Sequence, residues 1–95
     1  MRLGVDEAKT VRQEIRRLDP DAEIYLYGSR ADDSARGGDI DLLVLSDKLG
    51  FRDVLRLRTA ILDQLGWQQL DLVVRRRDQL NEPLAAAARE TGVRL

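Results

Sequence analysis

Two short segments, LYGSR at residues 26–30 and DIDLLV at residues 39–44, decide the fold of this chain. The first is typical of a β-strand that ends in a Gly-Ser turn, and the second of a strand that carries two aspartates. Side chains alternate between the faces of a strand, so Asp39 and Asp41 project from one face and the apolar residues from the other. Carboxylates about 4 Å apart repel by about 1 kcal/mol in water and about 4 kcal/mol at an effective dielectric constant near 20. The pair therefore favours a divalent cation that neutralises it.

Periodic apolar patterns on either side of these segments predict the remaining elements. The first helix ends at Asp19, because the residue before Pro20 is pushed away from helical angles. Gly66 ends the second helix as a C-terminal cap, and Pro83 near the first helical position marks the start of the third, which Gly92 stops. The predicted elements are helix 6–18, strand 23–27, strand 39–45, helix 51–65, strand 67–74, a helix that starts at 81–83 and runs through 84–90, and a short strand at 93–95.

The element order α-β-β-α-β-α predicts an α/β (α+β) fold with a small mixed β-sheet and helices packed mainly on one face. Ninety-five residues correspond to one domain, residues 1–95, with little room for a separate substrate-binding module. A large acceptor would then be positioned by another molecule. No apolar stretch approaches the roughly 20 residues that span a bilayer, and no signal peptide opens the chain, so we expect a cytoplasmic protein without membrane contact.

The composition excludes several classes of chemistry. The chain has no cysteine and no histidine, which removes Ser-His and Cys-His nucleophiles and makes a zinc site improbable. The remaining carboxylates suit hard metals such as magnesium or manganese. A net charge of -1 provides no overall basic field, so direct nucleic-acid binding is not expected.

A third acidic residue lies on the strand predicted at 67–74. Alternation places Leu70, Leu72 and Val74 on one face of that strand and Asp71 on the other. Asp71 is therefore a third carboxylate carried by a strand.

These residues carry a family resemblance. Gly28-Ser29-Arg30, the Asp39-Ile40-Asp41 pair and Asp71 together resemble the signature of the DNA polymerase beta-like nucleotidyltransferases. At this length the chain is similar to the minimal nucleotidyltransferases, or MNT proteins, and the resemblance covers nearly the whole sequence. One departure is the loop between Gly-Ser and the first aspartate, which has nine residues (30–38) where the family commonly has ten.

The resemblance implies a role for each motif residue. Asp39 and Asp41 would bridge two Mg²⁺ ions, with Mn²⁺ as the alternative, and Asp71 would complete the site that activates the acceptor hydroxyl. Gly28 would let the backbone approach a triphosphate, and Ser29 would offer a hydroxyl and an N–H group. Arg30, with Arg36 as a second candidate, would pair with the β- and γ-phosphates.

Each motif also has a purely structural interpretation. Gly-Ser is a common turn dipeptide, Asp-x-Asp is usually a solvated strand face, and Asp71 alone would be an ordinary surface residue. Their joint order on predicted strands favours the metal site. The basic run at 75–77 is interpreted as a solvated strand exit, in preference to a contact with RNA or an acidic partner. The four aromatic residues are interpreted as core or interface residues, in preference to a platform on which a base stacks.

The leading functional hypothesis is a magnesium-dependent nucleotidyltransferase that moves NMP from an NTP, with ATP as the expected donor, to a hydroxyl. The resemblance further implies a partner, because minimal proteins of this family often stand beside a HEPN toxin and act as its antitoxin by adenylylating it. The HEPN protein would then supply the acceptor.

Two rival hypotheses remain open. One is a non-catalytic antitoxin or scaffold that neutralises its partner by complex formation, which the shortened loop leaves open. The other is transfer to tRNA or to a small alcohol, which would need an acceptor surface created by a dimer interface. A homo-oligomer is compatible with so short a chain.

Overall fold

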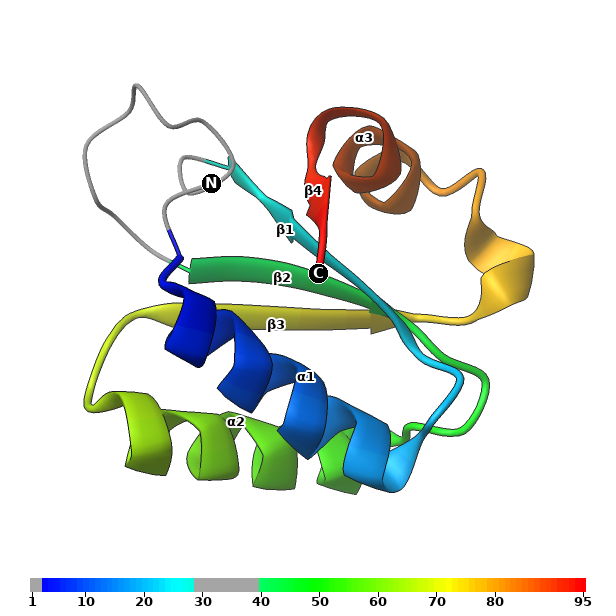
Figure 1. The fold of residues 1–95 in the computed structure, drawn as a ribbon. Helices are drawn as coiled ribbons and strands as arrows, with labels where there is room; N and C mark the ends of the chain where they lie inside the picture. The colour runs from blue at the N-terminus through cyan, green and yellow to red at the C-terminus, as the bar shows by residue number, and fades with distance from the viewer. Residues whose placement is uncertain (1–2, 29–39) are drawn as a thin grey trace.

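The computed structural model describes residues 3–28 and 40–95, which form a four-stranded sheet flanked by helices (Figure 1). The elements are α1 (Val5–Leu18), β1 (Glu23–Tyr27), β2 (Ile40–Leu45), α2 (Phe51–Leu65), β3 (Leu70–Arg75), the short 3-10 helix η2 (Arg77–Gln79), α3 (Pro83–Thr91) and β4 (Val93–Arg94). The predicted mixed fold class and element order are confirmed. Within the described ranges, no helix is long and apolar enough to cross a bilayer.

The strand order in the sheet is β3-β2-β1-β4, with β2 between β1 and β3. β1 pairs antiparallel with both β2 and β4, whereas β2 and β3 run parallel. The C-terminal end of β1 and the N-terminal ends of β2 and β3 therefore meet at one end of the sheet (Figure 1). The LYG and IDL segments lie at that end.

The two faces of the sheet have separate cores. α1 and α2 lie side by side on one face, and α3 covers part of the other (Figure 1). The larger core fills the space between the sheet and α1 and α2, and its sheet residues are Ile24, Leu26, Ile40, Leu42, Val44 and Leu70. The smaller core lies under α3 and consists of Tyr25, Leu43, Leu45, Ala85 and Ala88. Two of the three α-helices share a face, as predicted.

Local signals account for the helix boundaries. The Asp53 side chain accepts a hydrogen bond from the Gly50 backbone N–H at the start of α2, and Gly66, with φ at +83°, ends that helix. Pro83 occupies the first turn of α3, where the Glu82 carboxylate accepts a hydrogen bond from the Ala85 N–H at 3.0 Å. These caps confirm the predicted positions of the second and third helices.

The predicted start of the third strand is wrong. Strand pairing begins at Leu70, opposite Ile40, and not at Trp67. Trp67 lies in the connection that follows the Gly66 cap, and 85% of its surface is exposed. Phe51, at 78% exposure, is also outside the core, so the core interpretation of the aromatic residues holds for Tyr25 and fails for these two.

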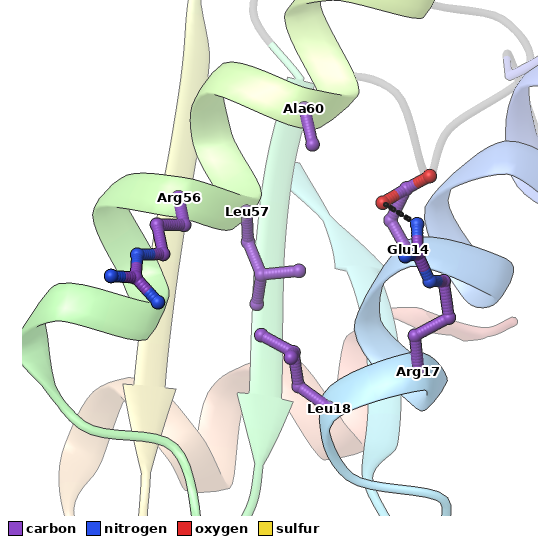
Figure 2. Close-up of a pocket in the computed structure, with 6 residues that line it drawn as sticks. All are labelled: Glu14, Arg17, Leu18, Arg56, Leu57 and Ala60. Atoms are coloured by element: carbon purple, nitrogen blue, oxygen red, sulfur yellow. Dashed lines mark hydrogen bonds and ion pairs between the residues drawn. The ribbon is translucent and has the colours of Figure 1, made fainter.

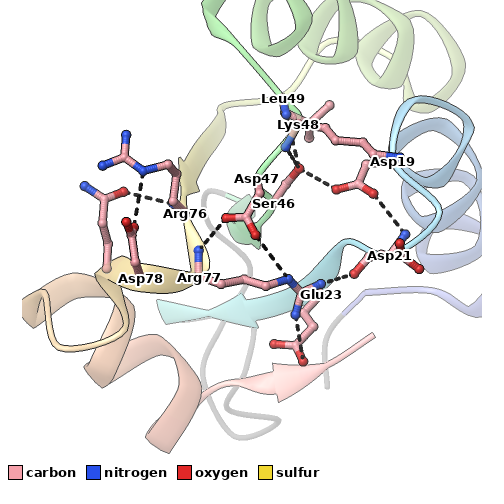
Figure 3. A network of polar contacts seen from close by, with 11 residues as sticks. Asp19, Asp21, Glu23, Ser46, Asp47, Lys48, Leu49, Arg76, Arg77 and Asp78 are labelled. Carbon is pink, nitrogen blue, oxygen red and sulfur yellow. Dashed lines mark hydrogen bonds and ion pairs between the residues drawn. The ribbon is translucent and has the colours of Figure 1, made fainter.

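Away from the LYG and IDL end, a buried polar contact joins α1 to β2 (Figure 3). Ser46 Oγ donates a hydrogen bond of 2.5 Å to Asp19 Oδ2, and both residues are buried. Ser46 Oγ also accepts from the Lys48 N–H, and Asp19 accepts from the Asp21 N–H. Burial alone raises the pKa of Asp19, but these hydrogen bonds together with Lys48 and Arg77 lower it overall.

Candidate functional site

Two of the three predicted site aspartates occupy matched positions on neighbouring strands. In the parallel pairing of β2 with β3, Asp41 lies directly opposite Asp71. Strands in a sheet lie about 4.8 Å apart, so the two side chains start from adjacent points of the same sheet face. That face is the one covered in part by α3, because the alternate residues Leu42 and Leu72 belong to the core beneath α1 and α2. The structure thus brings Asp41 and Asp71 together, as the sequence predicts.

Gly28 lies against the Asp41 carboxylate. Its φ of +73° is in the left-handed region that favours glycine. A Cβ atom placed on Gly28 would be 2.4 Å from Asp41 Oδ2, much closer than such contacts allow. The absence of a side chain at Gly28 therefore creates the space that the Asp41 carboxylate occupies.

Tyr27 borders the same carboxylates. It pairs with Asp41 in the antiparallel register of β1 and β2 and is half-buried. Burial is the main cause that raises the pKa of Tyr27, and the negative charges of Asp41 and Asp71 raise it further, against a smaller opposing effect of Arg75. Tyr27 is not among the predicted site residues. The alternation of strand 23–27 could have indicated it, because it places Tyr27 on the face away from Ile24 and Leu26 and directly before Gly28.

The other predicted site residues lie outside the described residues. These are Asp39, Ser29 and Arg30, together with the second arginine candidate, Arg36. Their assignments and the consequence of the nine-residue spacing stay predictions.

Comparison with protein families decides the classification. Residues 8–86, most of the chain, match the family model described as a nucleotidyltransferase domain. The chain belongs to this family. No curated protein matches the sequence. As a nucleotidyltransferase domain, the chain has the general activity of transferring a nucleoside monophosphate from an NTP.

Nucleotidyltransferase domains generally use divalent metal ions, and the paired carboxylates of this domain are compatible with one. Over residues 3–28 and 40–95, no group of three acidic, histidine or cysteine residues gathers at one point. Asp41 and Asp71 provide two of the three predicted ligands, and their oxygen atoms suit Mg²⁺ or Mn²⁺. The Asp41 carboxylate is half-buried beside Gly28, in space that a Cβ on Gly28 would fill.

The basic run at 75–77 makes contacts within the chain. Arg75 Nε lies 3.4 Å from Glu82 Oε2, and Arg76 Nε lies 3.2 Å from Asp78 Oδ1. Arg77 reaches back to β1 and to the β2 exit: its side chain is 3.6 Å from Glu23 Oε1, and its backbone N–H donates to Asp47 (Figure 3). These ion pairs support the interpretation of the run as a strand exit.

A shallow groove lies between α1 and α2 and has a volume of about 140 Å³. Figure 2 shows Leu18 and Leu57 pointing toward each other across it, with Arg56 on α2 and the Glu14–Arg17 pair on α1. Both helices cover the sheet face opposite to Asp41 and Asp71. This groove therefore lies on the other side of the sheet from Asp41 and Asp71.

Proposed function

We propose that this domain is a magnesium-dependent nucleotidyltransferase that transfers AMP from ATP to a hydroxyl group of a partner protein. The observation that carries the proposal is the matched position of Asp41 and Asp71 on β2 and β3, with Gly28 against the Asp41 carboxylate. A structural role alone would not require two acidic side chains opposite each other, since like charges at paired strand positions destabilise a sheet.

In the proposed site, Asp39 joins Asp41 and Asp71 in holding two Mg²⁺ ions, and Ser29 and Arg30 contact the triphosphate. The metal ions would neutralise the charge on the phosphoryl oxygens. In the reaction, the acceptor oxygen bonds to the α-phosphorus, the bond from that phosphorus to pyrophosphate breaks, and the hydroxyl proton leaves to a nearby base. Asp71, exposed at the start of β3, is the carboxylate proposed to face the acceptor.

The proposed acceptor is a HEPN toxin, which makes the domain the antitoxin of a toxin-antitoxin pair. Support for this partner comes from the resemblance of the GSR and DID motifs to those of the minimal nucleotidyltransferases. Modification of the toxin by AMP would be the means of neutralisation.

The test combines the purified domain, the protein encoded beside it, which the proposal expects to be a HEPN toxin, Mg²⁺ and each of the four α-³²P-labelled NTPs in turn. We expect label to move from ATP to the HEPN protein. Asp41→Asn and Asp71→Asn should each reduce transfer by about 100-fold or more, because each removes a charge needed in the transition state. Asp63→Asn is the matched control, since Asp63 is exposed on α2 away from the site, and it should keep the wild-type rate.

The same experiment separates catalysis from simple binding. If the domain inhibits the HEPN protein without label transfer, and if Asp41→Asn and Asp71→Asn inhibit equally well, the domain acts by complex formation and the catalytic proposal is wrong. Transfer from another NTP would correct only the choice of ATP.

A further inference from the structure

One row of paired residues crosses three strands at the end of the sheet that carries the LYG and IDL segments. Tyr27 on β1 pairs with Asp41 on β2, and Asp41 pairs with Asp71 on β3. Side chains at directly paired positions share a face and start about 5 Å apart. Tyr27 is therefore the third member of the row that contains both described carboxylates.

The Tyr27 ring is held in place by the core under α3. It packs against the buried cluster formed by Tyr25, Leu43, Leu45, Ala85 and Ala88. Because the ring is half-buried and anchored, its hydroxyl has little freedom to move away from the site. This arrangement is preorganised, since ordering the side chain costs little when a ligand binds.

Over residues 3–28 and 40–95, no hydrogen bond fixes the Tyr27 hydroxyl, and no side-chain polar atom there is buried without a partner. The hydroxyl of this half-buried residue is therefore open to solvent and to a ligand. A phenol has an ordinary pKa of about 10, so the hydroxyl carries its proton at neutral pH. It is thus a neutral, fixed donor beside two acidic side chains, and such a donor can bind an anion without adding a charge to the site.

We propose that the Tyr27 hydroxyl donates a hydrogen bond to a phosphate oxygen of the bound NTP. This inference rests on the proposed function and adds a binding residue to it. The hydrogen bond is made to the nucleotide before and during transfer, so it contributes to nucleotide affinity more than to the rate of the chemical step.

The experiment compares Tyr27→Phe with Tyr25→Phe. Tyr25 lies on the same strand and the same face, is buried, and pairs with Leu43 instead of an aspartate, so Tyr25→Phe removes the same atom away from the carboxylates. Affinity is measured by calorimetry with Mg²⁺ and α,β-methylene-ATP, in which AMP transfer is blocked. Steady-state kinetics with ATP and the HEPN protein give KM and kcat.

We expect Tyr27→Phe to raise both the dissociation constant for the analogue and the KM for ATP by about tenfold, as for one hydrogen bond to a charged group. The kcat should stay near the wild-type value, because a group that binds ground state and transition state equally affects KM alone. Tyr25→Phe should leave all three values unchanged.

Three outcomes would overturn the inference. Wild-type affinity in Tyr27→Phe, with transfer intact, removes the role of Tyr27 and leaves the proposed function standing. An equal loss in Tyr25→Phe shows a structural effect of the shared core. If the wild-type domain neither binds the analogue nor transfers AMP, the proposed function fails and the role of Tyr27 fails with it.

Discussion

Gly28 and Asp41 are packed so closely that a single methyl group on Gly28 would lie 2.4 Å from Asp41 Oδ2. The two residues come from different strands, since Gly28 directly follows β1 and Asp41 lies on β2. The glycine of the Gly-Ser turn therefore shapes the position of a proposed metal ligand, in addition to any contact that it makes with a nucleotide.

Gly28→Ala should lower the transfer rate by about 100-fold, because the new methyl group displaces the Asp41 carboxylate and displacements near 1 Å can have effects of this size. The control is Gly66→Ala. Gly66 also has a positive φ, +83°, but a Cβ there meets nothing within 4 Å.

Both alanine variants should lose about 1–2 kcal/mol of stability from backbone strain, measured as the free energy of unfolding in urea. Only Gly28→Ala should lose transfer activity. Equal activity in the two variants would show that the Gly28–Asp41 contact has no catalytic consequence.

Ser46→Ala should lower the free energy of unfolding by about 1–3 kcal/mol at pH 7, because it leaves the buried Asp19 carboxylate without its hydroxyl donor. Thr59→Ala is the control. Its exposed hydroxyl bonds only to the Leu55 carbonyl within α2, so the change should stay within about 0.5 kcal/mol.

The same contact predicts a dependence on pH. The pKa of Asp19 is lowered in the folded state, so the carboxylate contributes stability above its unfolded pKa of about 3.9. That contribution should be lost as the pH falls from about 4 through the folded pKa. Urea denaturation between pH 7 and pH 3 should show a smaller difference between wild type and Ser46→Ala at the acid end. A difference that stays constant with pH would contradict the role of Asp19.

Arg77→Ala should lower the free energy of unfolding by about 1 kcal/mol. Its side chain contacts Glu23 and Asp47 and donates to the Asp21 carbonyl, but it is partly exposed, so each ion pair contributes little. Arg76→Ala removes a more exposed side chain that is paired with the neighbouring Asp78, and it keeps the backbone N–H that donates to Gln79, so it should change stability by less than about 0.5 kcal/mol.

Added salt provides a second readout for Arg77. In 1 M NaCl the Debye length falls to about 3 Å, so the difference between Arg77→Ala and wild type should shrink. A larger effect of Arg76→Ala than of Arg77→Ala would show that the contacts with β1 and the β2 exit do not stabilise the fold.

Much of the fold could be predicted because its signals are local. The strand at 23–27 and the helix at 51–65 match β1 and α2 residue for residue, since Pro20 and Gly66 mark boundaries that depend only on backbone chemistry. The third strand was predicted to start too early because Trp67, directly after the Gly66 cap, is a residue type enriched in strands. Pairing with β2 determines where β3 begins, and pairing is a contact between residues distant in the sequence.

In the candidate site too, local signals predicted some features, and contacts between distant residues determined the others. Residue type and alternation identified Asp41 and Asp71, but their direct opposition depends on the register of two strands separated by α2. The position of Tyr27 beside them depends on a second register. The partners of Arg77, on β1 and after β2, could not be predicted from a run of three arginines.

Gly92→Ala should destabilise the fold by about 1–3 kcal/mol, because Gly92 is the point where the end of α3 meets β1. A Cβ on Gly92 would lie 2.4 Å from the Ala88 carbonyl oxygen and 2.7 Å from that of Leu26. Both are backbone atoms, so the chain must shift to relieve the overlap, and overpacking of this kind has costs in that range. The pairing of β4 with β1 begins at the next residue and should loosen.

Gly50→Ala, where the nearest atom is 3.9 Å away, is the control for Gly92→Ala, and it should cost less than about 1 kcal/mol in urea denaturation. Faster amide hydrogen exchange confined to β4 and the last turn of α3 in Gly92→Ala would locate the change. Equal stability in the two variants would show that this close approach is not needed for the fold.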